Sequence, residues 1–195
     1  MSYDISLKDP VTMETLHSKF KHEMTGGTYA IGGTDELWLN ITYNYSHYYY
    51  EATDGDSRFA HDEVSCYYSD GTTGPIETEY GIRGIYGKTG AESIPLLNDM
   101  IKRIGEKYKV NGKWITTKRT GIRYKDERGK EIEAYDAIYR LANKDPFVTK
   151  EEYEYEVDEG NTEGYWEPTA AKAIRPLYQL LAMAQMRPDG VWDGD

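Results

Sequence analysis

The sequence predicts an α+β fold, in which an antiparallel β-sheet carries two or three helices on one face and the C-terminal helix is central to the core. Two observations lead to this prediction. Apolar residues at alternate positions, typical of strands, run through the first 45 residues and return near residue 153. Helical spacing of apolar residues follows Gly90, begins again near Tyr135, and returns after Thr169.

The first 45 residues predict strands and turns. Residues 3–7 alternate in polarity, and the Asp9-Pro10 turn before residues 11–16 predicts an opening β-hairpin. Two Gly-Gly-Thr units between residues 25 and 34 predict turns around a short strand at 29–31. The clearest strand has apolar or tyrosine residues at every second position, namely Leu37, Leu39, Ile41, Tyr43 and Tyr45.

The middle of the chain predicts a loop, a helix and a hairpin. Residues 53–80 are poor in apolar residues and predict a loop or loosely ordered insertion, in which residues 64–68 could form a strand. The first predicted helix follows Gly90 and must begin close to Pro95 to accommodate that proline, and Gly105 is its expected end. Residues 108–124 predict strands that turn at Asn111-Gly112.

The last third predicts two helices and a strand between them. Residues 135–142 form the first helix, and the alternation of residues 151–157 predicts an edge-like strand with an acidic face. Thr169 is the expected N-cap of the last helix, and Pro176 should kink that helix or mark its true start. Residues 187–190 end it and leave Trp192 to fold back.

Composition limits the classes of function. The chain of 195 residues fits a single domain, 1–195, and its net charge of −11 argues against duplex DNA or an anionic membrane as a partner. The single cysteine, Cys66, excludes an internal disulfide and fits a reducing compartment. No signal peptide or membrane-spanning run is visible, so we expect a cytoplasmic protein.

Charge is segregated along the second half of the chain. Residues 107–130 carry a net charge of +7, and residues 150–167 carry −7. The two segments could be neighbouring strands whose charges face each other. Alternatively, one of them is an interaction surface: the 107–130 segment for nucleic acid, or the acidic residues Glu152, Glu154 and Glu156 for a protein with a basic surface.

Tyrosine is unusually common: the chain has 19 Tyr and 3 Phe, and five of residues 43–50 are Tyr. If residues 43–50 form a strand, Tyr43 and Tyr45 continue its apolar face into the core, and the predicted partner contacts are Tyr48, Tyr49 and Tyr50. The alternative is a small-molecule or nucleotide site on this aromatic strand. Its predicted residues are Tyr43, His47, Arg83 and Arg123.

Motifs for catalysis or metal binding are weak. The Gly-rich run at residues 26–33 lacks the order of a phosphate-binding loop and predicts turns. The histidines, His17, His22, His47 and His61, lack zinc-site spacing, although His61-Asp62-Glu63 with Asp54 and Asp56 is a weak metal candidate. Cys66 has no visible partner base. We therefore predict no catalytic residue, no metal and no cofactor, and an enzyme is the least supported hypothesis.

Five segments carry a resemblance to other proteins: 26–30, 38–45, 82–87, 90–95 and 186–190. Through them the chain resembles a group of small uncharacterised proteins of bacteriophages and prophages of gut bacteria. The resemblance covers residues 1–52, 80–105 and 165–195, and it implies that 53–80 and 106–160 are insertions in a smaller core. It implies a mobile-element origin and brings no active site.

The expected function is therefore that of a non-enzymatic acidic binding protein inside a host cell. By analogy with small acidic phage proteins, it would inhibit a host nucleic-acid-handling or defence protein by stoichiometric binding. The small-molecule site remains the alternative, and an enzyme the second alternative.

Overall fold

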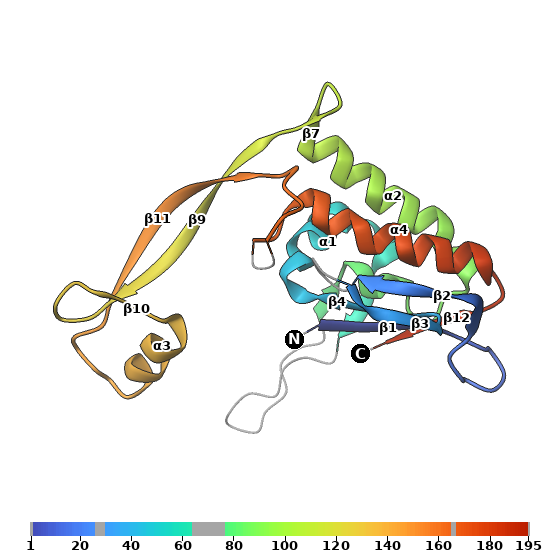
Figure 1. The fold of residues 1–195 in the computed structure, drawn as a ribbon, viewed down its shortest axis with the longest axis horizontal. Coiled ribbons are helices and arrows are strands. Elements are labelled where there is room, and N and C mark those ends of the chain that lie inside the picture. Colours follow the sequence, from blue (N-terminus) through green and yellow to red (C-terminus); the bar gives the residue numbers. More distant parts are fainter. Residues whose placement is uncertain (1, 26–29, 64–76, 165–166, 195) are drawn as a thin grey trace. The chain divides into compact units, whose positions relative to one another are not determined.

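The computed structural model describes residues 2–25, 30–63, 77–164 and 167–194, and Figure 1 shows their fold. The chain forms two compact units. The first unit contains Met1–Trp114 and Gly160–Asp195, and the second contains Ile115–Glu159. The second unit lies within the 106–160 segment that the resemblance marks as an insertion. Antiparallel strands and helices together confirm the α+β class.

The main sheet of the first unit has three antiparallel strands in the order β12–β1–β4. They are β1 (Ser2–Lys8), β4 (Trp38–Thr42) and β12 (Val191–Gly194). Ile5 lies opposite Leu39, and Leu7 lies opposite Trp192. Because all four side chains are buried, this strand register is also the one that places them in the core.

The predicted opening hairpin is confirmed only next to its turn. Within the turn, the Asp9 carboxylate accepts from the amides of Val11 and Thr12. Beyond it Lys8 and Thr15 form an antiparallel bridge, where the Asp9 amide donates to Glu14 O and the Leu16 amide to Leu7 O, both at 2.9 Å. The next strand, β2 (His17–Thr25), pairs with β3 (Ala30–Glu36). Most of β1 therefore pairs with the distant strands β4 and β12.

The second Gly-Gly-Thr unit is a strand and not the predicted turn. Gly33 and Thr34 lie within β3, opposite Glu23 and His22 of β2. The ladder reaches Gly33, because its hydrogen bonds join backbone groups and need no side chain, and its register shifts between Glu23 and Thr25. Residues 26–29, which include the first unit, lie outside the described residues.

The tyrosine run is helical, which contradicts the predicted strand. After β4 the chain forms the 3₁₀ turn η1 (Tyr43–Tyr45) and the helix α1 (Ser46–Thr53). The strand ends at Thr42, whose hydroxyl accepts from the Asn44 amide and caps the turn. The alternation of buried and partly exposed residues therefore ends with β4, and the tyrosines that follow are not part of a strand.

Residues 53–80 hold short elements in their described parts. They are η2 (Ser57–Phe59), β5 (His61–Glu63) and β6 (Glu77–Glu79), and the two strands pair with each other. The strand suggested at 64–68 lies outside the described residues. A 3₁₀ turn, η3 (Ile82–Ile85), follows.

Helix α2 (Gly90–Tyr108) begins with a capping box. Thr89 accepts from the Glu92 amide, and the Glu92 carboxylate accepts from the Thr89 amide. The predicted stop at Gly105 is wrong, because the helix runs three residues further. A Cβ at Gly105 would meet no atom within 4 Å, so this glycine costs some helix propensity without a packing reason to end the helix.

The predicted hairpin turn at Asn111-Gly112 is confirmed. It joins β7 (Lys109–Val110) to β8 (Lys113–Trp114), and both turn residues have positive φ, 51° and 76°. Positive φ at both central positions is the requirement of a type I′ turn, which Asn and Gly meet most easily.

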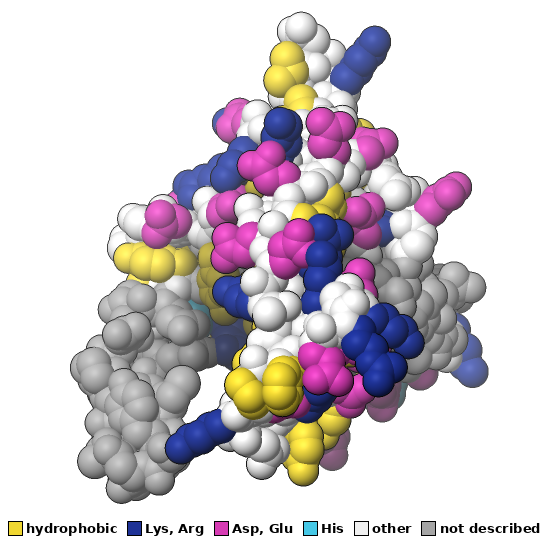
Figure 2. Space-filling view, turned by 90° about the vertical axis from the view of Figure 1, so that its left-hand side faces the viewer, with side chains coloured by type: hydrophobic (Ala, Val, Ile, Leu, Met, Phe, Trp, Pro, Cys, Tyr) yellow, Lys and Arg dark blue, Asp and Glu magenta, His cyan; other side chains and the backbone are white. Residues whose placement is uncertain are grey.

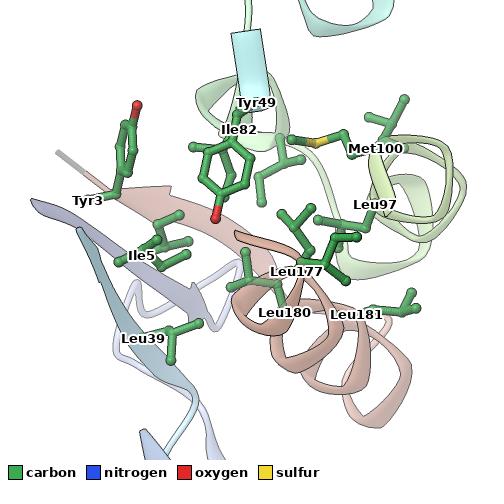
Figure 3. Close-up of a cluster of buried hydrophobic side chains, with 14 of the residues drawn as sticks. Tyr3, Ile5, Leu39, Tyr49, Ile82, Leu97, Met100, Leu177, Leu180 and Leu181 are labelled. Carbon is green, nitrogen blue, oxygen red and sulfur yellow. The ribbon is translucent and has the colours of Figure 1, made fainter. Parts of the chain in front are cut away.

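Helix α4 (Ala170–Met186) is central to the core, as predicted. Thr169 is its N-cap and accepts from the Lys172 amide. Pro176 lies inside the helix, so the alternative that Pro176 marks its start is wrong. Figure 3 shows Leu177, Leu180 and Leu181 of α4 directed toward side chains of the sheet, of α1 and of α2.

Strand β12 returns the chain onto the start of α2. The Trp192 backbone donates to Lys88 O and accepts from the Gly87 amide, at 3.0 and 2.9 Å. Its indole Nε1 donates to Ser93 Oγ at 2.7 Å, and the side chain is buried. The prediction that Trp192 folds back is confirmed.

The second unit is a two-stranded ribbon with a small tip. Strand β9 (Thr116–Lys125) pairs with β11 (Thr149–Asp158) along their whole lengths, from Thr116 opposite Asp158 to Lys125 opposite Thr149. Strand β10 (Glu131–Ile132) pairs with the end of β9, and helix α3 (Ala134–Ala142) follows. The predicted helix and the predicted strand at 151–157 are both confirmed.

Two glycine substitutions should change stability in opposite directions. A Cβ at Gly84 would lie 2.5 Å from the backbone oxygen of Phe59, so Gly84→Ala should lower the free energy of unfolding by about 1–3 kcal/mol. Gly105→Ala fills open space in a helix and should raise it by about 0.5–1 kcal/mol. Urea denaturation followed by tryptophan fluorescence measures both, and equal effects would contradict this packing.

Candidate functional site

The pairing of β9 with β11 explains the charge segregation. Lys118 lies opposite Glu156, and Arg123 lies opposite Glu151. The interpretation of neighbouring strands with facing charges is therefore confirmed. Arg123 donates to both Glu151 oxygens, at 3.1 and 2.9 Å, and Lys125 also pairs with this carboxylate. These hydrogen bonds, first that of Arg123, lower the pKa of Glu151 to about 2.

One face of the ribbon is satisfied internally. The Tyr153 ring covers Gly121, where a Cβ would lie 2.6 Å from the ring, and the Arg123 guanidinium lies 5.2 Å from the ring centroid. At the base of the ribbon the buried Glu159 carboxylate accepts from Thr117 and Arg119, at 2.6 and 2.8 Å. The charged side chains of this face thus already have partners within the unit.

The other face presents a row of exposed carboxylates. The row consists of Glu152, Glu154, Glu156 and Asp158, which alternate along β11 and so point to the same side. The residues opposite them on β9 are Ile122, Thr120, Lys118 and Thr116. Lys150, which precedes the row on the same face of β11, lies 3.6 Å from the Glu152 carboxylate, so two lysines accompany the four acids. The three predicted glutamates therefore lie on one exposed face. We call these four carboxylates the acidic row.

The acidic row is a local feature of the surface. Figure 2 shows Asp and Glu side chains intermixed with Lys and Arg on the face it presents, with hydrophobic side chains exposed among them. The net charge of −11 is therefore not spread as a uniform negative coat. The sign of a preferred partner depends on rows such as this one.

Helix α3 turns its large apolar side chains outward. Tyr135, Ile138 and Tyr139 are 82%, 58% and 66% exposed, whereas Ala137 is fully buried. Positions i, i+3 and i+4 share one side of a helix, and Ala137 lies on the opposite side. The helix therefore packs through a small residue and presents what we call the apolar face of α3.

This apolar face was not identified from the sequence. The helical spacing of residues 135–142 was recognised, but such a stripe ordinarily faces a core. The tip has little core to offer, since Ala137 is the single buried residue of the helix. The sequence before and after α3 is mostly polar, so it supplies few apolar residues to cover the apolar face of the helix.

Two of the predicted partner contacts, Tyr48 and Tyr49, are buried and so do not form a contact surface. In α1 the spacing of 45, 48, 49 and 52 puts these residues on one inward side. Tyr48 donates to Pro168 O at 3.1 Å and Tyr49 to Ala173 O at 2.9 Å, so both phenols have partners near the start of α4. Tyr45 is buried as predicted, and Tyr50 is 39% exposed.

The residues of the predicted ligand site do not form one cluster. Arg83 and Tyr43 do meet, with Nη2 to hydroxyl at 3.0 Å, and the guanidinium also lies 5.4 Å from the Tyr3 ring centroid. His47 is exposed, with its ring 3.9 Å from the Tyr48 ring. Arg123 belongs to the second unit, where Glu151 holds it. The structure thus supports one pair of this set.

The weak metal and nucleophile candidates gain no support. Hydrogen bonds from Arg58 and then Arg103 hold the pKa of Asp56 well below its usual range, and His61 Nδ1 lies 3.3 Å from Phe59 O. Among the described residues, no three His, Cys, Asp or Glu side chains gather where they could hold a metal ion. Cys66 lies outside the described residues, as do the side chains of His22, Asp62 and Glu63.

No protein-family model, curated protein or solved structure matches this chain. Within the ranges that the structure describes, no helix is long and apolar enough to cross a membrane. The features that bear on function are the exposed side chains of the second unit and a pocket on the first unit.

The Glu151 ion pair should make the ribbon sensitive to acid. In the folded protein the pKa of the Glu151 carboxyl is about 2, below its ordinary value of 4.5. The ion pair therefore stabilises the fold fully above pH 4.5, and this stabilisation is lost as the pH falls toward 2. Carbon-13 NMR should show the Glu151 carboxyl titrating near 2. Arg123→Gln should move the midpoint toward 4.5, whereas Arg128→Gln, at the exposed turn, should not. A midpoint near 4.5 in the unsubstituted protein would contradict the pairing.

Proposed function

We propose that this protein is a non-enzymatic binding protein whose second unit contacts a partner protein with a basic surface. The apolar face of α3 carries the proposal. A folded unit gains nothing by holding Tyr135, Ile138 and Tyr139 in water while a small alanine takes the buried side. An exposed group of large apolar side chains typically marks an interaction site.

The residue types of this face suit a protein contact. Tyrosine is enriched at the energetic centres of interfaces, because its ring buries much area and its hydroxyl keeps a polar contact. Fully burying a large apolar side chain contributes about 1.5–3 kcal/mol, so three such residues can provide several kcal/mol of binding. The spacing i, i+3, i+4 is that of a helix bound in an apolar groove.

The acidic row supports a partner of positive charge. The four carboxylates at alternate positions of β11 outnumber the two lysines on their face, Lys118 and Lys150, which leaves local negative charge. Such a row raises the association rate with a basic surface and disfavours acidic ones. Proteins that handle nucleic acid carry basic surfaces of this kind, since phosphate binding requires them. We propose that the partner belongs to this class, as a host defence or nucleic-acid-handling protein inhibited by a phage-derived protein.

Direct binding of nucleic acid through residues 107–130 is less well supported. Arg119, Arg123 and Lys125 of this segment are paired with Glu159 or Glu151. A phosphate would have to compete with carboxylates that are already in place. The opposite strand therefore neutralises much of the charge that suggested a nucleic-acid site.

Loss of the apolar face should weaken binding at least about tenfold without unfolding the protein. In Ile138→Ser/Tyr139→Ser the thermal midpoint should stay within about 2 °C, because both side chains are exposed. The matched control is Tyr178→Ser, a 57% exposed tyrosine of α4 in the first unit.

The measurement has two steps. A photo-crosslinking residue at Tyr139 should capture one partner from host-cell lysate, and the same residue at Tyr178 should not. With the purified partner, the double variant should bind at least about tenfold more weakly by calorimetry, with the control unchanged. Unchanged affinity of the double variant, or equal crosslinking from both positions, would refute the proposed surface.

Neutralising the acidic row should slow association. Glu152→Gln/Glu154→Gln/Glu156→Gln should lower the association rate constant by about tenfold at low salt, and the difference should fade at high salt. The control removes the same charge elsewhere, by Glu14→Gln/Glu106→Gln/Glu163→Gln, at exposed positions of the first unit. Surface plasmon resonance measures both rates. Equal slowing would show that only net charge matters.

A further inference from the structure

A pocket of about 390 Å³ opens on the first unit. Among the described residues it is lined by Tyr50, Glu51, Asp54 and Tyr80. Three of these come from α1 and the residue after it, and the fourth precedes η3. The volume falls in the range of small-molecule sites.

Gly81, a glycine with positive φ, lies against the Tyr50 ring and next to Tyr80. Gly81 has φ of 114°, a region that residues with a Cβ rarely adopt. A Cβ at Gly81 would lie 2.9 Å from two atoms of the Tyr50 ring, so that ring rests against the Gly81 backbone, one residue from Tyr80. Any side chain at position 81 would displace the Tyr50 ring, so this wall of the pocket requires a glycine at that position.

The carboxylates make the pocket negative. The Glu51 carboxylate accepts from Lys107 and Tyr108, at 2.9 and 2.6 Å, and although burial acts in the opposite direction these bonds lower its pKa. Asp54 is exposed and makes no hydrogen bond or ion pair with the other described residues. Lys107 therefore balances Glu51, and the charge of Asp54 remains for a ligand.

The other nearby cations are also occupied. Arg103 donates to the Ala52 carbonyl and pairs with Asp56, at 3.0 and 2.6 Å. Arg58 pairs with both Asp56 and Asp99. The negative charge of the pocket is thus not cancelled by these arginines.

We propose that this pocket binds a small organic cation through an alkylated ammonium group. Electron-rich phenol rings attract such a group, and a carboxylate at the rim adds Coulomb attraction. The two carboxylates exclude an anion such as a nucleotide phosphate. A bare metal ion would find two carboxylates but no third oxygen or nitrogen donor from an acid or His in the described residues.

The test compares choline with its neutral isostere, 3,3-dimethyl-1-butanol, titrated into the purified chain and followed by NMR of the tyrosine rings. Choline should shift the Tyr50 and Tyr80 resonances and bind at least about tenfold more tightly than the alcohol. Equal affinity for the two would overturn the proposal, because shape alone would then explain binding. No partner protein is present, so the result is independent of the proposed protein contact.

Variants locate the site. Tyr80→Ala should abolish the shifts, and Asp54→Asn should weaken choline binding several-fold while leaving the alcohol unaffected. Tyr178→Ala, which removes an exposed tyrosine elsewhere in the first unit, should bind choline normally. Asp54 is exposed, so Asp54→Asn should keep the fold and decides the question even where Tyr80→Ala does not fold. Choline binding that Asp54→Asn leaves unchanged would overturn the assignment.

Discussion

The pairing of β12 with β1 is the interaction on which the first unit depends. Strand β12 is held on its other side by the backbone of residues 87–90, and Trp192 reaches Ser93 inside α2. One short strand therefore joins the sheet, the start of α2 and the end of α4 around a single buried indole. Because residues 5–8 and 191–194 are far apart in sequence, this core closes only after a large loss of chain entropy.

The second unit depends on a different interaction, a charge-paired ladder with little apolar core. In this unit, which the structure describes completely, the buried residues are Ala137, Val148, Val157 and Glu159. Backbone hydrogen bonds and the ion pairs of Arg119 and Arg123 supply the order that a core would otherwise provide. A unit built in this way can leave large apolar side chains outside, since its own folding does not require them.

Local signals predicted much of this fold. The Thr169 cap, the Asn111-Gly112 turn and the spacing of α3 each depend on neighbouring residues, and each was recognised. The strand predicted for the tyrosine run was wrong. Alternating aromatic residues favour a strand, but Tyr45, Tyr48 and Tyr49 can all be buried beside α4 only if they are three or four residues apart on a helix. The spacing of apolar residues in α3 also predicts that the helix has an apolar side, but it does not predict whether that side is covered. The pocket could not be predicted, because it depends on Gly81 meeting the Tyr50 ring.

The apolar face of α3 also sets a condition on the protein when no partner is present. Two copies that met through this face would bury the same side chains that a partner would bury. The net charge of −11 opposes that encounter, because like-charged molecules repel at distances where apolar contact has not begun. Salt screens this repulsion as well as the attraction to a basic surface. For the proposed basic partner, rising ionic strength would therefore favour self-association over partner binding, and electrostatics would select which molecule covers the helix.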